Sequence, residues 1–144
     1  MKTKSASEVV TAARELASKF PKAVYERSPP TGCGNTTGRV IVDGETVMTG
    51  CIVGCAIKQC EPHVDGENGA YQWMKEHEHS TAGDVLKGLK IDTIEDEDLL
   101  WLCEVQEGQD GGLCWMAAAE KADASIVEFK KLDEYDRQEI LNHL

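Results

Sequence analysis

The apolar positions at the start of the chain follow the repeat of an α-helix. Ser5-x-x-Glu8 matches a capping box, in which two side chains satisfy the first free backbone N–H groups. Pro21 ends the pattern, since proline cannot donate to the helix ladder. We therefore expect an amphipathic helix rather than a signal peptide, because no apolar run follows the first lysines. Its inward positions are Val9, Ala12, Ala13, Leu16, Ala17 and Phe20.

The pattern changes to that of a β-hairpin over residues 38–49. β-branched residues lie on both sides of Asp43-Gly44, a pair that favours a type I′ turn. The apolar segment 50–60 follows and predicts a short central helix, capped by Thr49 and ended by Pro62. The hairpin is therefore expected to lead directly into the core.

The segment before the hairpin, residues 22–38, is rich in Pro, Gly, Asn and Thr and predicts a loop that Tyr25 holds down. Helical spacing returns after the central helix, and Asp110-Gly111-Gly112 is a predicted helix stop. The predicted helix caps in this second half are Asn68, Ser80 or Thr81, Thr93 with Asp96, Ser125 with Glu128, and Asp133.

Length and composition fit one folded unit. The chain has 144 residues, of which 41% are hydrophobic and 28% charged, as in globular proteins. The longest apolar run, 51–57, contains Gly54 and is far shorter than a membrane span of roughly 20 residues. We predict a mostly helical α+β fold with one β-hairpin, a single domain over residues 1–144, no membrane partner and a cytoplasmic location.

The net charge of −11 is concentrated in one segment. No Lys or Arg lies between Lys90 and Lys121, whereas nine acidic residues do, so residues 91–120 account for nine of the eleven net charges. Such a charge disfavours direct binding to nucleic acid, whose phosphates need Lys and Arg. The nine are Asp92, Glu95, Asp96, Glu97, Asp98, Glu104, Glu107, Asp110 and Glu120.

These acids lie next to two tryptophans, Trp101 and Trp115. Acidic residues around exposed aromatic side chains are typical of protein-binding surfaces, where Trp contributes strongly at the centre. A solvated face with both tryptophans in the core is the alternative. We predict a surface for a partner protein with basic residues, and self-association stays open. Its residues are Asp96, Glu97, Asp98, Trp101, Glu104, Glu107, Asp110 and Trp115.

Three cysteines and a histidine within residues 49–63 raise the question of a metal site. On a helix, Cys51 and Cys55 share one face, but Cys60 lies on the opposite one. A tetrahedral site would have to add His63 and Cys33, and this spacing fits no common zinc or iron–sulfur pattern. We therefore expect reduced thiols that fill the core and no cofactor, with a metal-binding or redox-sensing protein as the alternative.

Sequence motifs for catalysis do not emerge. The segment GCGNTTGR lacks the Lys-Ser/Thr pair of a phosphate-binding loop, and neither Gly-x-Ser-x-Gly nor His-Glu-x-x-His occurs. A cysteine nucleophile would need a histidine that only the fold can supply. The sequence therefore favours a binding protein over an enzyme.

Two segments, RVIVDGETVMTGCIVGCAI and VQEGQDGGLCWMAAAEKA, resemble a group of small uncharacterised proteins of actinobacteria and their phages. The likeness spans residues 38–123, and its pattern includes Cys51, Gly54, Gln109, Asp110 and Trp115 but often lacks a cysteine at position 55. The group supplies no catalytic residues. The resemblance implies a phage-type accessory protein that binds and modulates a host protein. Imitation of DNA by carboxylates is the further alternative.

Overall fold

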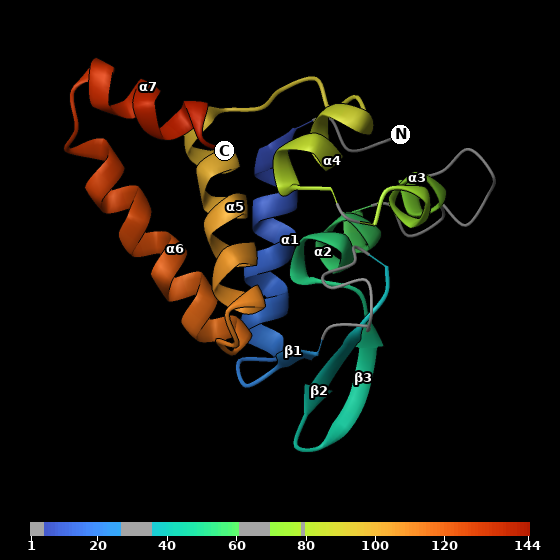
Figure 1. Cartoon of the computed structure of the whole chain (residues 1–144). Helices are drawn as coiled ribbons and strands as arrows, with labels where there is room; N and C mark the ends of the chain where they lie inside the picture. The colour runs from blue at the N-terminus through green and yellow to red at the C-terminus, as the bar shows by residue number, and fades with distance from the viewer. Residues whose placement is uncertain (1–4, 27–35, 61–69, 79) are drawn as a thin grey trace.

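The computed structural model describes residues 5–26, 36–60, 70–78 and 80–144, and for residues 70–72 the backbone alone. The chain forms a mostly helical α+β fold with a small antiparallel sheet, as the sequence predicts (Figure 1). The elements are α1 (Ala6–Lys19), β1 (Val24–Glu26), β2 (Arg39–Val42), β3 (Glu45–Thr49), α2 (Ile52–Cys60), α3 (Ala70–Glu76), α4 (Ala82–Gly88), α5 (Asp96–Asp110), α6 (Trp115–Lys130) and α7 (Glu134–Asn142).

The core lies between α1, α2, α5 and α6. Helices α1 and α5 run side by side in the same direction, α6 returns antiparallel to α5, and α7 crosses the far ends of α5 and α6 (Figure 1). The backbone N–H of Ala6 donates to the carbonyl of Thr93 at 2.8 Å, which ties the start of α1 to the segment before α5. Small residues on α1, such as Ala13 and Ala17, let its neighbours pack closely.

The predicted hairpin is confirmed, and its strands belong to a three-stranded sheet in the order β1-β2-β3. Asp43 and Gly44 have φ angles of 52° and 80°, as the predicted type I′ turn requires. The sequence analysis missed β1, which lies in the expected loop. Its central residue Tyr25 does hold the chain in place, because its hydroxyl donates to the carbonyl of Thr37 at 2.9 Å.

Several predicted caps are wrong. Ser5 is the N-cap of α1 but makes no side-chain cap hydrogen bond, and α5 begins after Glu95 rather than after Thr93. Thr49 ends β3, and Ser125 lies inside the continuous helix α6. At Thr93, Thr49 and Ser125 the local pattern was present, but no helix begins there. At Ser5 the predicted helix start is right, and only the side-chain hydrogen bond is missing.

Two predicted caps are confirmed. The Thr81 hydroxyl accepts from the backbone N–H of Asp84 at 3.2 Å, and the Asp133 carboxylate accepts from that of Asp136 at 2.8 Å. The Gly111-Gly112 stop after α5 is also confirmed, with Gly112 at a φ of 100°. Within the described part of the chain, no helix is long and apolar enough to cross a membrane.

Candidate functional site

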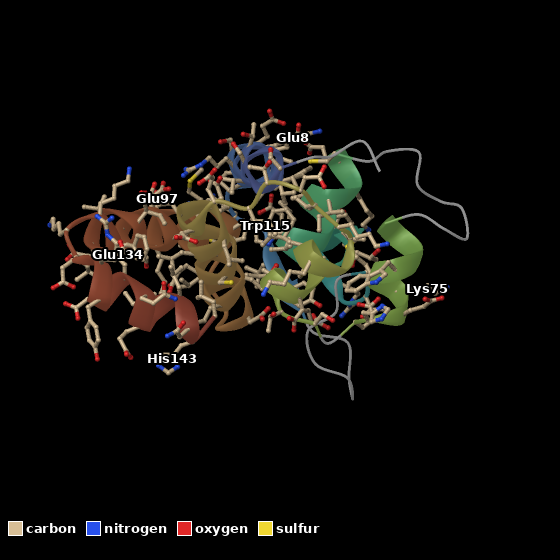
Figure 2. The ribbon with its side chains drawn as sticks, turned by 90° about the horizontal axis from the view of Figure 1, so that it is seen from above. Glu8, Lys75, Glu97, Trp115, Glu134 and His143 are labelled. Carbon is tan, nitrogen blue, oxygen red and sulfur yellow. The ribbon has the colours of Figure 1, made fainter. Side chains whose placement is uncertain are left out.

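Both tryptophans of the predicted surface lie in the core. Trp101 is 1% exposed and Trp115 is fully buried, so the prediction that they anchor a partner is wrong. Figure 2 places Trp115 in the middle of the molecule, far from the outer acidic residues Glu97 and Glu134. Burial is favourable because the ring removes a large apolar area from water and each indole N–H finds an acceptor.

Trp101 belongs to a cluster that joins three helices. Its indole N–H donates to the Asp123 carboxylate of α6 at 2.9 Å, and the same oxygen pairs with Arg14 of α1 at 2.7 Å. The Arg14 guanidinium also lies 4.6 Å from the centre of the Trp101 ring, within cation–π distance. The hydrogen bond from Arg14 lowers the pKa of Asp123, with a smaller contribution from Trp101. Asp123 therefore stays ionised and fixes α6 against α1 and α5.

A second buried polar cluster centres on Gln109, which is fully buried at the end of α5. Its side-chain oxygen accepts from the backbone N–H of Ile52 at 2.7 Å and from the indole N–H of Trp115 at 3.3 Å. Its side-chain nitrogen donates to Asp110 at 2.7 Å. Gln109 thus satisfies a free N–H at the start of α2, and the two sequence segments that carry the resemblance meet here.

Asp110, which the sequence analysis assigned to the binding surface, is therefore the acceptor for Gln109. The Cys51 sulfur accepts from the backbone N–H of Gly54 at 3.4 Å, so this cysteine caps α2 in place of the predicted Thr49. The residues of the shared pattern therefore each take part in a hydrogen bond of the fold. They are Cys51, Gly54, Gln109, Asp110 and Trp115.

The acidic residues of α5 point to different sides of the helix, because successive positions turn by about 100°. Asp96 and Glu97 are exposed, whereas Asp98 is half-buried and faces Arg14. Burial raises the pKa of Asp98, and Glu95 and Glu97 raise it further, while Arg14 opposes them. The predicted acids are thus not one continuous row.

Helix α6 supplies cations to this segment. Lys130 lies 3.7 Å from the Glu97 carboxylate, and Lys121 lies 4.0 Å from that of Glu107. Residues 91–120 contain no cation of their own, but the fold therefore brings two lysines from α6 to their carboxylates. Both pairs are exposed to water, so each reduces the local potential only partly.

The remaining charge is still unevenly placed along the chain. Residues 91–144 contain 15 acidic and four basic side chains, a net charge of −11, whereas residues 1–90 contain eleven of each. The whole net charge thus belongs to α5, α6, α7 and their connections. We call the outward sides of these helices the α5–α6–α7 surface.

One cleft of this surface, of about 440 Å³, lies where α5 begins. Arg137 of α7 reaches into it, and its guanidinium lies 5.6 Å from the Phe129 ring. Arg137 also donates to the carbonyls of Phe129 at 3.2 Å and Lys130 at 2.8 Å, as favoured at a helix C-terminus. We call this cleft the acidic cleft, because the carboxylates that line it are those of Glu95, Asp96, Glu97, Asp98 and Glu134.

A second cleft, of about 350 Å³, lies between α5, α6 and α7. Its lining includes the buried Leu100 and Phe129 and the half-buried Ile140 of α7. Sequence reasoning missed this cleft, because its residues come from three helices with no common motif. We call it the apolar cleft, and its charged lining residues are Glu104, Lys121 and Glu128.

The cysteines give little support for a reactive or metal-binding site. Cys51 and Cys55 are buried, and desolvation raises the pKa of Cys55 to about 11, so its thiol keeps its proton at neutral pH. Cys60 is partly exposed. Among the described residues, no group of three metal-ligating side chains comes together, and Cys33 and His63 lie outside them.

A cysteine and a histidine do share one cleft, of about 540 Å³, between α4, α5 and the last residues of the chain. These are Cys103 and His143. Burial raises the pKa of Cys103, nearby Glu104, Glu107 and Asp84 add to the rise, and a backbone hydrogen bond with Gly83 opposes it. A nucleophilic cysteine needs the opposite shift, so the cleft does not favour covalent catalysis.

Comparison with known proteins found no matching family model, no matching curated protein and no matching solved structure.

Proposed function

We propose that this chain is a small acidic cytoplasmic protein that binds a partner protein with a basic surface through the α5–α6–α7 surface. The observation that carries the proposal is the separation of charge: residues 91–144 hold the whole net charge of −11. A charged surface of one sign attracts an oppositely charged partner and speeds its association.

The resemblance to actinobacterial and phage proteins extends this proposal: the partner is a host protein and the chain is an accessory protein that modulates it. Trp101 and Trp115 are buried, so they do not serve as the expected anchor for a partner. The proposal relies instead on exposed side chains. Exposed apolar residues are present on this surface, since Val127 of α6 is 54% exposed and Tyr135 of α7 is 73% exposed.

The other two functions have less support. Imitation of DNA needs carboxylates along a path, whereas Asp96, Glu97 and Asp98 diverge around α5. A cysteine-based metal or redox site needs accessible thiolates, whereas Cys51 and Cys55 are buried and the pKa of Cys55 is raised to about 11.

The test is capture of a partner from host lysate with the full chain, followed by association kinetics with the purified partner. Reversing Asp96→Lys with Glu104→Lys removes one carboxylate from each cleft, and we expect association to slow about tenfold or more at low salt. The difference should shrink as salt screens the charges.

The matched control is Glu15→Lys with Glu45→Lys, which changes the net charge equally on exposed residues of α1 and β3. This control should slow association much less. Equal slowing by both double variants would mean that total charge, rather than the α5–α6–α7 surface, sets the rate. An unchanged rate in the first variant, with its fold intact, would show that the acidic residues serve only solvation.

A further inference from the structure

The apolar cleft arises because α5 and α6 touch at one end and separate toward the other (Figure 1). At the closed end Gly108 faces Ala118, where an added Cβ would lie 3.2 Å from that of Ala118. Ala122, one turn further along α6, is still fully buried. Beyond it the helices diverge, and α7 lies across the gap.

Helix α7 covers this gap incompletely. All of its residues are described, and none of them is fully buried. Ile140 and Leu141 are half-buried, and Ala124 of α6 is exposed at the mouth of the apolar cleft. Apolar surface of α5 and α6 therefore remains accessible beside α7, above the buried side chains of Leu100 and Phe129.

We infer that the apolar cleft receives apolar side chains from a basic amphipathic helix of the partner. This inference rests on the proposed function and adds what the partner presents to the surface. Amphipathic helices bind hydrophobic grooves by apolar residues spaced three or four positions apart. The anchors would pack on Ala124, Leu132 and Ile140 while flanking Lys or Arg residues meet the acids around them.

Charge complementarity selects this occupant. Two acids, Glu104 and Glu128, line the cleft together with one cation, Lys121. The surrounding residues 91–144 carry a net charge of −11. A second copy of the chain would bring the same negative surface to the cleft, so self-association through this face is opposed by like charges. A basic helix instead gains attraction from the same residues.

The size of the cleft agrees with side-chain anchors. Its volume of about 350 Å³ is at the lower end of small-molecule pockets, which span roughly 300–1,000 Å³. The cleft thus holds one or two large apolar side chains, while the rest of the partner helix lies along the charged rim.

The test uses the full chain and two labelled peptides of equal charge and length. One is an amphipathic lysine–leucine helix, and the other has alanine at every leucine. We expect the lysine–leucine peptide to bind about tenfold or more tightly than the lysine–alanine peptide, since burial of larger apolar side chains favours binding. Fluorescence anisotropy gives both dissociation constants, and the methyl resonances of Leu132 and Ile140 report the location.

The variant Ala124→Phe fills the mouth of the cleft and should weaken the lysine–leucine peptide about fivefold or more while leaving the lysine–alanine peptide unchanged. Val47→Phe is the matched control, because Val47 is also exposed but lies on β3, outside the α5–α6–α7 surface. It should change neither affinity.

The outcomes separate this inference from the proposed function. Equal, salt-sensitive binding of both peptides would overturn the apolar anchor and leave a purely electrostatic partner surface. Binding of neither peptide would overturn both proposals. Tight binding of the lysine–leucine peptide with shifts only outside Leu132 and Ile140 would place its site elsewhere and overturn the inference. Equal sensitivity of its binding to Ala124→Phe and to Val47→Phe would do the same. Dimerisation of the chain through Leu132 and Ile140, with the peptide excluded from the cleft, would make a second copy the occupant and overturn the inference.

Discussion

Residues 1–90 and residues 91–144 contribute to one core, but they carry charge very differently. The first part is electrically balanced with eleven acidic and eleven basic side chains, and the second has 15 acidic and four basic. Burial of apolar side chains drives folding in both parts. The charge excess adds nothing to that burial, and self-repulsion opposes the compact state. The core and the proposed binding surface thus use opposite sides of the same helices, α5 and α6.

The two parts are joined by a few buried polar contacts. Removing one of them should have the largest effect on the free energy of unfolding. Gln109→Met keeps the approximate length of the side chain but leaves the N–H groups of Ile52 and Trp115 without this acceptor. Each buried donor left unsatisfied costs about 1–3 kcal/mol, so the free energy of unfolding should fall by roughly 3 kcal/mol. Urea denaturation measures the change.

The control for this experiment is Gln138→Met, a replacement of an exposed glutamine on α7. It should alter the free energy of unfolding by less than about 0.5 kcal/mol. A similar small loss for Gln109→Met would mean that the two parts do not depend on this connection.

An intermediate effect is expected where Asp123 joins α6 to α1 and α5. Asp123→Ala removes the acceptor of the Trp101 indole N–H and the partner of Arg14, and should lower the free energy of unfolding by about 1–2 kcal/mol. Asp123→Asn keeps a side-chain oxygen for Trp101 and should cost less than half as much, since an exposed ion pair contributes little.

Thermal and urea unfolding of both variants sharpen the comparison by separating the hydrogen bond from the charge. If Asp123→Asn is as unstable as Asp123→Ala, the negative charge beside Arg14 is the main stabilising feature. That result would contradict the expectation that Asp123→Asn costs less than half as much stability as Asp123→Ala.

The smallest effect on the free energy of unfolding is expected from the partly buried carboxylate of Asp98 in the acidic part. The pKa of Asp98 is raised by burial and by Glu95 and Glu97, so the folded state binds more protons than the unfolded state above the ordinary Asp value. The free energy of unfolding should therefore fall as pH rises from about 3.9 through the raised pKa, and stay lower above it. Asp98→Asn should remove this penalty, a few tenths of a kcal/mol near neutral pH.

The measurement is urea unfolding of the native chain and Asp98→Asn between about pH 4 and pH 7, and the stability of the variant relative to the native chain should rise across this range. A fall instead would mean that the favourable position of the carboxylate at the start of α5 outweighs its burial. Gln138→Met is the control, because it replaces no titratable group, and its stability relative to the native chain should not vary across this range.

Features that depend on neighbours along the chain could be predicted from the amino-acid sequence. The helical class, the Asp43-Gly44 turn, the caps at Thr81 and Asp133 and the stop at Gly111-Gly112 follow from backbone preferences that act within a few residues. The concentration of acids in residues 91–120 is likewise a property of the sequence alone.

Contacts between side chains that are distant in the sequence could not be predicted, because they depend on how the helices pack. Trp101 and Trp115 share their sequence neighbourhood with the acids, yet they are buried because α1, α2 and α6 pack around them. Gln109 reaches Ile52 across 57 positions, and the apolar cleft combines residues of three helices. Helix spacing tells which residues share a face, but the packing of helices against one another determines whether that face meets the core, a cation or water.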